Sequence, residues 1–332
     1  MANLGKKLLI VGVLACFVFA GLAGYGDVRE VSGRMASFPF PSLLLAVGLA
    51  LLNYLLRFLR WAYYLKILAV SVPLRLSILI FLTGLAMTIT PGKLGELLKC
   101  YLLRDQAGIP VSTSAPAVLM ERITDLVAIG VMALVGLALL PAFVSAILVA
   151  VVAGLVLVAY FSTARQDERV LDLPIIRRWR ADIVEAREGV RTLSRPVPLL
   201  VASILGLAAW LSEGVALWVV MEGLGADLGF LISLPIYAGS LLAGAVTTLP
   251  GGLVGTEGAM VTLLQQMGAG RDAAAAGTLI VRLVTLWLAV LVGFAAFGWL
   301  QWSGVRRRYP KEEGGGAHES GLPEAGGGQG RG

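Results

Sequence analysis

The chain has 332 residues, of which 58% are apolar and 14% charged, and its mean hydropathy is +0.84. This composition excludes a soluble globular domain, and the long apolar runs indicate a polytopic helical membrane protein. Period-2 alternation is absent, which excludes an outer-membrane barrel. The net charge of +6 gathers in a few loops, so membrane orientation explains it better than nucleic-acid binding.

Apolar segments follow one another along the chain, at about 8–24, 41–66, 76–103, 116–140, 142–162, 197–221, 230–266 and 275–302. A spanning helix needs about 20 residues. The first segment follows Lys6 and Lys7 and ends among small residues, as a signal peptide would. We interpret it as a retained span, because polytopic proteins often begin in this way.

Two of these segments are interrupted by a Pro-Gly pair that is followed by small residues and a carboxylate. The first motif runs from Pro91 to Glu96, and the second from Pro250 to Glu257. Proline and glycine break helices. The pieces 76–90 and 94–103 are each too short to cross a membrane alone, and 231–249 and 254–266 repeat that pattern. The recurrence indicates two copies of one unit.

Loop charge distinguishes between two topologies. The loop 163–196 holds eight arginines, two lysines precede the first span, and a basic cluster at 306–311 follows the last. By the positive-inside rule all three regions should be cytoplasmic. That requires about six full spans plus two re-entrant hairpins, with both termini cytoplasmic in the cell inner membrane. The units 41–140 and 197–302 then form an inverted-topology repeat in one membrane domain, 1–310.

Two further segments have distinct compositions. Within the linker 163–196, apolar residues at 3-4-3-4-3 spacing predict an amphipathic helix: Ile176, Trp179, Ile183, Ala186, Val190 and Leu193. Such a helix either lies on the anionic inner leaflet or docks on the loops of the protein itself. The tail 311–332 is Gly-rich and polar, and we expect it to be disordered.

The two motifs also carry the first candidate site residues. The half-helix starting near Lys93 directs free N–H groups and a positive dipole into the membrane, which suits an anion such as a lipid phosphate. In the second motif the glycines permit close backbone approach. We expect ion pairs Glu96–Arg122 and Glu257–Arg282. The alternative is that both carboxylates only stabilise a first helical turn.

Other charged residues extend the candidate set. Glu121, Arg122 and Asp125 lie close together along one predicted helix, and Lys99 follows the first motif. Arg57 and Arg60 serve either as interfacial anchors at the inner surface or as headgroup contacts. Glu213 has no charged neighbour in its helix, so we expect it to face the bundle. The full set is Arg57, Arg60, Pro91, Gly92, Lys93, Gly95, Glu96, Lys99, Glu121, Arg122, Asp125, Glu213, Pro250, Gly251, Gly252, Gly255, Glu257 and Arg282.

These motifs together resemble the lysylphosphatidylglycerol synthase/flippase transmembrane family. They are Arg57-x-x-Arg60-Trp61, Thr90-Pro91-Gly92-Lys93-Leu94-Gly95-Glu96, Glu121-Arg122-x-x-Asp125 and Leu249-Pro250-Gly251-Gly252 with Gly255-Thr256-Glu257. In the family's aminoacyl-lipid proteins the membrane region moves the modified phospholipid between leaflets, and a soluble domain makes it. The soluble aminoacyltransferase domain is missing from this sequence, so we do not expect the chain to synthesise the lipid.

The leading functional interpretation is a flippase that binds and translocates a phosphate-bearing lipid, with membrane lipids as partners. The alternatives are a lipid-linked glycosyl- or acyl-transferase and a secondary solute transporter. We expect no enzyme activity, metal or cofactor, because the only histidine, His318, lies in the tail and no nucleotide-binding motif occurs. A separate lipid-modifying enzyme and a homo-oligomer stay open as further partners.

Overall fold

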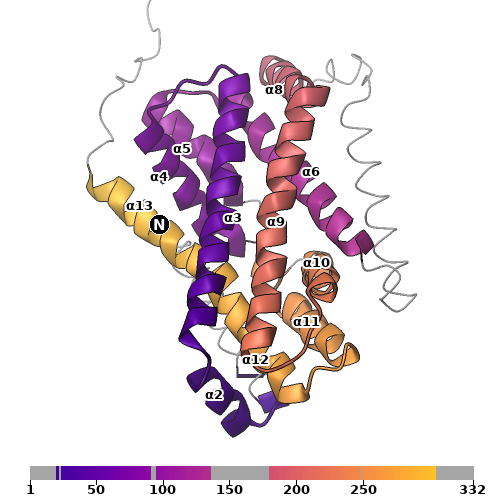
Figure 1. The fold of residues 1–332 in the computed structure, drawn as a ribbon. Helices are drawn as coiled ribbons and strands as arrows, with labels where there is room; N and C mark the ends of the chain where they lie inside the picture. Colours follow the sequence, from indigo (N-terminus) through magenta and orange to yellow (C-terminus); the bar gives the residue numbers. More distant parts are fainter. Residues whose placement is uncertain (1–19, 22–23, 91–94, 136–178, 248, 304–332) are drawn as a thin grey trace, which may run out of the picture.

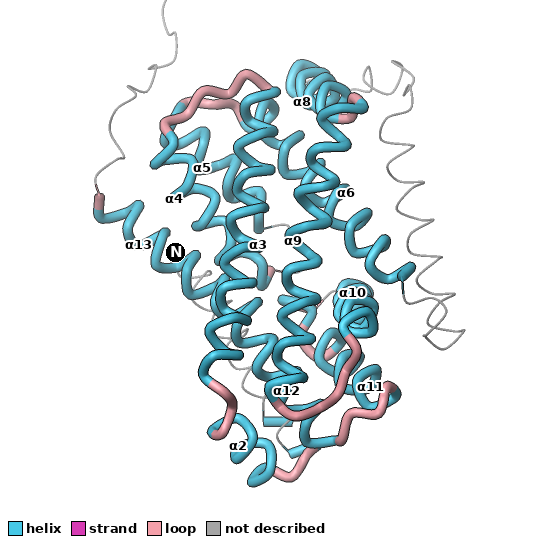
Figure 2. The backbone as a smooth tube through the Cα atoms, in the orientation of Figure 1, coloured by secondary structure: helices cyan, strands magenta, loops and turns pink. Residues whose placement is uncertain are grey.

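The computed structural model describes residues 20–21, 24–90, 95–135, 179–247 and 249–303. Within these ranges the chain is helical, with connecting turns and no strand (Figure 2). The all-helical membrane fold predicted from the sequence is confirmed. The expected spans at 8–24 and 142–162 and the tail 311–332 fall wholly or mainly outside the described residues, so the count of six spans stays a prediction.

The helices are labelled in Figure 1. In chain order the elements are α2 (Val28–Ala36), α3 (Phe40–Ile67), α4 (Leu74–Leu85), η1 (Ala86–Ile89), α5 (Leu98–Ala107), α6 (Val111–Val135), α8 (Arg180–Leu193), α9 (Pro196–Gly223), α10 (Phe230–Thr247), η5 (Pro250–Gly252), α11 (Gly255–Gln266), α12 (Arg271–Arg282), η6 (Leu283–Trp287) and α13 (Leu288–Trp302).

Four of the described helices are long and apolar enough to cross a membrane: α3, α9, α10 and the continuous helix from α12 to α13. The sequence-based expectation that the first arm of the second motif is too short to cross is therefore wrong for α10, which has 18 residues. The corresponding helix of the first motif, α4 with η1, is shorter.

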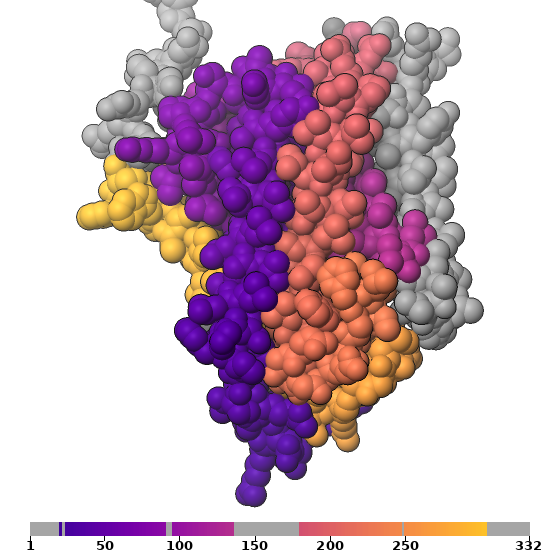
Figure 3. Space-filling view, viewed as in Figure 1, coloured from indigo at the N-terminus to yellow at the C-terminus, as the bar shows by residue number. Residues whose placement is uncertain are grey.

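Helices α3 and α9 pack side by side along the length of the molecule (Figures 1 and 3). Each has 28 residues and begins with proline in its first turn, where the missing N–H costs no intrahelical bond. A buried polar contact joins the pair, because the Asn53 side chain donates to the Ala209 carbonyl at 2.8 Å. The α3–α9 pair is the frame on which the other helices pack.

The two interrupted segments each fold as a helical hairpin. In the first, α5 packs back against α4, and in the second, α11 packs back against α10. The first hairpin lies toward the end of the molecule that carries α8, and the second toward the end that carries α2 (Figure 1). Each hairpin contributes to its own apolar core cluster.

The described parts of the two hairpin tips contact each other. Element η1 contacts η5, and a Cβ added at Gly251 would lie 3.7 Å from the Cα of Ile89. Ile89, Leu253 and Val290 form a small apolar cluster at this junction. Helix α13 packs directly against this junction. It can approach so closely because Gly293 has no side chain: a Cβ there would collide with the backbone nitrogen of Ala86. The residues that lead into the first break therefore pack against the second break.

The last helix changes its winding directly after Arg282. Residues Leu283–Trp287 form a π-helical turn, an irregularity that is often found at functional sites. The carbonyl of Thr285 in this turn accepts a 2.8 Å hydrogen bond from the Tyr54 hydroxyl of α3. Arg282 is therefore the last residue of α12, and the π-helical turn that follows it is hydrogen-bonded to α3.

Helix α8 tests one of the two interpretations of the amphipathic linker, its docking on the protein itself. Its residues Val190 and Leu193 are buried, and Glu185 accepts hydrogen bonds from Ser112 and Thr113 of α6, each at 2.6 Å. The described part of the amphipathic helix is therefore docked on the protein itself. Ile176, the first residue of the predicted apolar stripe, lies outside the described residues.

Candidate functional site

Seven charged side chains from the first half of the chain meet between α3, α5 and α6. We call them the charged cluster. Six are buried, and the seventh, Arg122, has a side chain that is 21% exposed. The members are Arg57 and Arg60 on α3, Glu96 in the short helical turn 95–97, Lys99 on α5, and Glu121, Arg122 and Asp125 on α6.

Glu96 lies among three of the cations. Its Oε2 is 2.8 Å from Nη2 of Arg122 and 4.0 Å from Nζ of Lys99, and its Oε1 is 3.5 Å from Nη2 of Arg57. The predicted Glu96–Arg122 pair is confirmed. Arg57 and Lys99 were not predicted as partners. The distance from Arg57 to Glu96 depends on how α3 packs, whereas Lys99 lies three residues after Glu96 and its proximity is local.

Lys99 is held firmly by a second carboxylate. Its Nζ donates to Oε2 of Glu121 at 2.5 Å and lies 4.5 Å from the centre of the Trp61 ring. Gly84 of α4 makes room for the lysine stem, because a Cβ there would lie 2.7 Å from Cγ of Lys99. The ammonium is therefore desolvated but fully compensated.

Asp125 binds the remaining arginines. Its Oδ1 accepts from Nη2 of Arg60 at 2.6 Å and from the indole N–H of Trp210 at 2.9 Å, and its Oδ2 is 2.9 Å from Nη2 of Arg122. Gly206 of α9 leaves space for Arg60, since a Cβ there would lie 2.6 Å from Nη1. Arg122 thus bridges Glu96 and Asp125 and is the most accessible member of the cluster.

Cations outnumber carboxylates in the charged cluster. Among the described residues the buried Nε atoms of Arg57, Arg60 and Arg122 find no hydrogen-bond acceptor, while both oxygens of Glu96 and Oδ2 of Asp125 meet the cations in ion pairs. Four cations face three carboxylates, and each carboxylate already has a cationic neighbour. Within the described ranges no three His, Cys, Asp or Glu side chains form a metal site. The cluster therefore suits an additional acceptor, such as the oxygens of an anion.

The second hairpin carries a simpler arrangement. Nε of Arg282 donates to Oε1 of Glu257 at 2.5 Å, and Nη2 donates to the Gly251 carbonyl at 2.7 Å. The predicted Glu257–Arg282 pair is confirmed. Gly251 and Gly252 adopt φ of +65° and +67°, which residues with a side chain rarely adopt, so the break needs both glycines.

The two hairpin tips are closed in a similar way. The N–H of Gly95 donates to Oγ1 of Thr90 at 2.9 Å, and a Cβ on Gly95 would lie 2.6 Å from that oxygen. In the second hairpin a Cβ on Gly255 would lie 2.5 Å from Cγ2 of Thr247. Each tip therefore packs a threonine from its first arm against a glycine that begins its second arm.

Glu213 faces the bundle, as predicted. It is 6% exposed, and its Oε2 accepts a 2.5 Å hydrogen bond from the hydroxyl of Tyr237 on α10. The hydrogen-bond partner of Glu213 could not be predicted from the sequence, because Tyr237 lies on another helix. Glu213 thus connects the frame helix α9 to the second hairpin.

Several predictions can be compared directly with these positions. The interpretation of Arg57 and Arg60 as interfacial anchors is wrong, because they are only 6% and 0% exposed and lie inside the cluster. Glu257 does lie in the first turn of α11, but its ion pair shows that helix stabilisation is not its only role. Pro91, Gly92 and Lys93 lie outside the described residues.

Sequence reasoning missed the residues that shape the cluster. Trp61 and Trp210 were not among the candidate site residues, yet one lies over Lys99 and the other donates to Asp125. Gly84 and Gly206 give no signal beyond being glycines inside apolar helices, where a packing reason is expected. Only the packed structure reveals which side chain each glycine accommodates.

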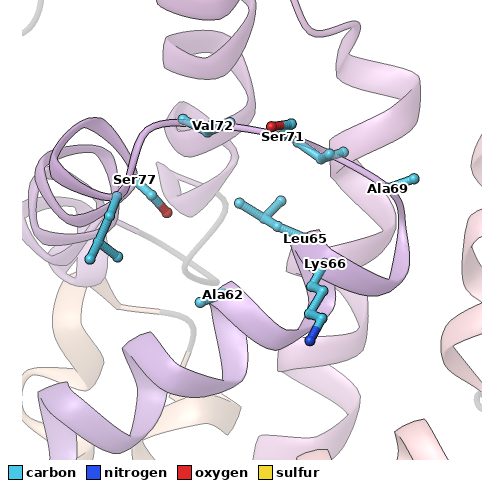
Figure 4. Close-up of a pocket in the computed structure, with 9 residues that line it drawn as sticks. Ala62, Leu65, Lys66, Ala69, Ser71, Val72 and Ser77 are labelled. Atoms are coloured by element: carbon cyan, nitrogen blue, oxygen red, sulfur yellow. The ribbon is translucent and has the colours of Figure 1, made fainter.

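A separate pocket of about 400 Å³ lies at the end of the first hairpin, between the last turn of α3 and the start of α4 (Figure 4). Its lining combines Lys66, Ser71 and Ser77 with apolar side chains. Ala62 in its wall directly follows Trp61, which covers Lys99. The pocket and the charged cluster therefore lie on neighbouring residues of α3.

Comparison with known proteins identifies the family of the chain. The family model for the lysylphosphatidylglycerol synthase transmembrane region matches residues 8–293. Two UPF0104 membrane proteins of Methanothermobacter thermautotrophicus are each 24% identical, over 89% and 88% of this chain and 95% and 93% of their own lengths. A UPF0104 membrane protein of Methanocaldococcus jannaschii is 23% identical over 63% of this chain and 92% of its own.

Proposed function

The chain belongs to the lysylphosphatidylglycerol synthase transmembrane-region family, and on this basis we propose that it binds a phosphate-bearing lipid and translocates it between the membrane leaflets. The lipid is a phospholipid or a polyprenyl phosphate. The headgroup phosphate binds in the charged cluster, at Arg122 and Arg57, while the acyl or prenyl chains stay in the bilayer.

The surplus of buried arginine donors carries this proposal. Arg57 is 6% exposed, and its closest carboxylate oxygen in an ion pair is 3.5 Å away, longer than a hydrogen bond. Arg122 is the most accessible cation of the cluster. A phosphate offers several acceptor oxygens in a geometry that guanidinium groups match, so it would satisfy these donors.

The arrangement of the hairpins supports translocation as well as binding. We infer that the α8 end of the molecule is cytoplasmic, as the arginine-rich linker indicates. The first hairpin then enters from the cytoplasm and the second from outside, as an inverted repeat whose tips meet near the bilayer midplane. Movement of one hairpin at this junction would expose the charged cluster to one side at a time.

Reconstitution into liposomes tests the proposal. Purified protein in vesicles of phosphatidylglycerol and phosphatidylcholine should transfer a labelled phosphatidylglycerol from the inner to the outer leaflet. The Arg122→Gln variant should lower this rate at least tenfold, because it removes the accessible cation. Arg271→Gln is the matched control, since Arg271 is exposed and begins α12, which packs against α2 at the opposite end.

Three outcomes would contradict the proposal. They are an unchanged rate in Arg122→Gln, chemical turnover of the lipid without transfer, and solute uptake without lipid movement. The last two results would favour a lipid-modifying enzyme and a solute transporter, respectively.

A further inference from the structure

The pocket between α3 and α4 is a cavity that the charged cluster does not use. It has a volume of about 400 Å³, and its nine lining residues lie within the stretch 62–77. None of them belongs to the charged cluster. Figure 4 shows the end of α3, the connecting loop and the start of α4 around it. A cavity of this size can hold a small polar group together with part of an apolar chain.

Ser77 contributes a buried hydroxyl to the pocket. The residue is 6% exposed and lies near the start of α4, and in Figure 4 its hydroxyl points into the cavity. Within the described ranges this hydroxyl has no hydrogen-bond partner. A buried hydroxyl without a partner is unfavourable, so its position indicates a ligand that completes its hydrogen bonding.

The N-terminus of α4 adds donors beside Ser77. Pro73 is the N-cap and provides no side-chain hydrogen bond, so the first N–H groups of the helix have no intrahelical acceptor. The first turn holds no acidic residue and instead carries Arg75, although the helix dipole favours a negative charge at this end. Leu74 and Ser77 place this turn in the pocket wall. An anion in the pocket would satisfy both the donors and the dipole.

The charge around the pocket has the sign that such an anion requires. Lys66 in the last turn of α3 lines the cavity, and Arg75 lies in the first turn of α4. Neither side chain forms an ion pair with another described residue. The sequence contains no aspartate or glutamate from residue 31 to residue 95. The pocket is therefore bordered by cations that the surrounding stretch leaves without a counter-charge.

The loop that forms the wall of the pocket has a fixed shape. The N–H of Val70 donates to the Leu65 carbonyl at 2.9 Å, and the N–H of Ala69 donates to the Lys66 carbonyl at 3.2 Å. Ala69 has a φ of +55°, a left-handed conformation that glycine usually occupies at the end of a helix. Strained residues of this kind are common where a ligand is held.

The remaining lining is apolar and lies at the depth of the lipid headgroups. Helix α3 has 28 residues and is about 42 Å long at 1.5 Å per residue, which exceeds a hydrocarbon core of about 30 Å. Its last turn therefore reaches the headgroup region. Leu65, Val70 and Val72 line the pocket, and Leu74 at its edge is 65% exposed. Polar donors beside an apolar wall suit an amphiphile better than a free ion.

We propose that this pocket binds the phosphate of an anionic membrane lipid, as a second lipid site apart from the charged cluster. The phosphate oxygens accept from the Ser77 hydroxyl and from the first N–H groups of α4, and Lys66 supplies the compensating charge. The acyl chains follow the apolar wall past Leu74 into the leaflet at the α8 end. Binding here requires no translocation, so the site is independent of the proposed function.

Photo-crosslinking tests the site. The full chain in nanodiscs of phosphatidylcholine is exposed to phosphatidylglycerol that carries a photoactivatable group in its headgroup, and the labelled peptides are identified by mass spectrometry. The label should appear within 62–77. Ser77→Ala and Lys66→Gln should each lower it about fivefold or more, because each removes a hydrogen bond to a charged group.

Two variants provide matched controls for these substitutions. Ser240→Ala removes a buried hydroxyl from α10 that donates to the Ile236 carbonyl at 2.6 Å. Arg191→Gln removes an exposed cation from the last turn of α8, as Lys66→Gln does from the last turn of α3. Both controls should retain the wild-type labelling of 62–77.

Competition distinguishes the possible ligands. An excess of unlabelled phosphatidylglycerol should displace the probe, whereas diacylglycerol or inorganic phosphate at the same concentration should not. Displacement by inorganic phosphate alone would make this a site for the free ion, and displacement by diacylglycerol would show apolar contact without phosphate recognition. Either result overturns the proposal, as does a wild type that is not labelled within 62–77 or labelling that Ser77→Ala leaves unchanged.

Arg122→Gln separates this site from the proposed function. That variant should lose lipid transfer and keep the label within 62–77, because Arg122 does not line the pocket. A label that disappears in Arg122→Gln would show that the lipid reaches 62–77 only through the charged cluster, and it would overturn the second site. A wild type that is labelled but transfers no lipid would contradict the proposed function alone.

Discussion

The two hairpins share a broken backbone but differ in the charges that surround the carboxylate after the break. Each is broken at a Pro-Gly motif and each carries a buried carboxylate near the start of its second arm. Glu96 of the first hairpin has three cations at 2.8–4.0 Å, contributed by three elements. Glu257 of the second has one arginine at 2.5 Å, and that arginine also holds the carbonyl of Gly251.

This difference separates a redundant network of ion pairs from a single ion pair. In the first hairpin Arg122 can release Glu96 without leaving a bare charge, because Asp125 also binds it and Arg57 and Lys99 remain near Glu96. In the second hairpin the release of Glu257 would leave a carboxylate that is 1% exposed without its cation. A network in which each carboxylate has more than one cation would tolerate the binding of a ligand to one of them. A single buried ion pair would instead hold its hairpin in one conformation.

The largest expected effect concerns stability and contrasts the two arginines. Arg282→Met should destabilise the protein by about 3–5 kcal/mol, because it leaves a buried carboxylate unpaired. Arg122→Met should cost less, roughly 1–3 kcal/mol, since both of its carboxylates keep other cations. Thermal unfolding in detergent would measure the two side by side.

A double variant provides the control for this comparison. Replacing Glu257 by Gln in the Arg282→Met background removes the unpaired charge and should recover a large part of the lost stability. If Arg122→Met proves as destabilising as Arg282→Met, the distinction between a redundant network and a single ion pair is wrong.

An intermediate effect is expected at the break of the second hairpin. Gly251→Ala should lower stability by about 1–2 kcal/mol, because a side chain is unfavourable at a φ of +65°. Gly258→Ala is the matched control in the same hairpin, since a Cβ there meets nothing within 4 Å inside α11. The control should unfold at the same temperature as the wild type or slightly higher. Equal losses in both variants would show that the positive φ does not matter.

The smallest expected effect lies at α8, which docks on α6 next to the first hairpin. Hydrogen bonds from the Ser112 and Thr113 hydroxyls lower the pKa of Glu185 below its ordinary value of 4.5. The ionised form therefore stabilises docking. This contribution is fully present above that ordinary value and is lost as the pH falls through the lowered pKa.

Glu185→Gln measures the size of this contribution. Because the side chain is exposed, the difference from the wild type should stay below about 1 kcal/mol at pH 7. It should vanish once the pH lies below the lowered pKa, where the wild-type carboxylate is itself protonated. Thermal unfolding at neutral and at acid pH tests this, and a difference that persists at the acid end would contradict the assignment.

Much of the architecture could be predicted because it depends on local sequence. The apolar runs, the Pro-Gly breaks and the 3-4 spacing of α8 are each readable within a few residues, and they correspond to helices, broken tips and a docked amphipathic helix. The pairs Glu96–Arg122 and Glu257–Arg282 were also predictable. Their matched spacing in the two motifs is a property of the chain itself.

The contacts that assemble the charged cluster were not predictable in this way. Arg57 and Arg60 look alike from sequence, yet one lies 3.5 Å from Glu96 and the other binds Asp125 at 2.6 Å. Their positions depend on the close packing of α3 against α9, which Gly206 permits. The sequence likewise gave no sign that Tyr237 would reach Glu213, because the residues lie on different helices.

The sequence by itself determined that this is a helical membrane protein with two Pro-Gly breaks, each followed by a carboxylate and an arginine. Hydropathy, helix-breaking residues and spacing are local properties, and they do not require the folded state. Only the tertiary structure decided that the described parts of the hairpin tips contact each other, that seven charges form one network and that the other hairpin has a single ion pair. Distances between side chains on separate helices exist only once those helices have packed, and those distances determine which charges pair.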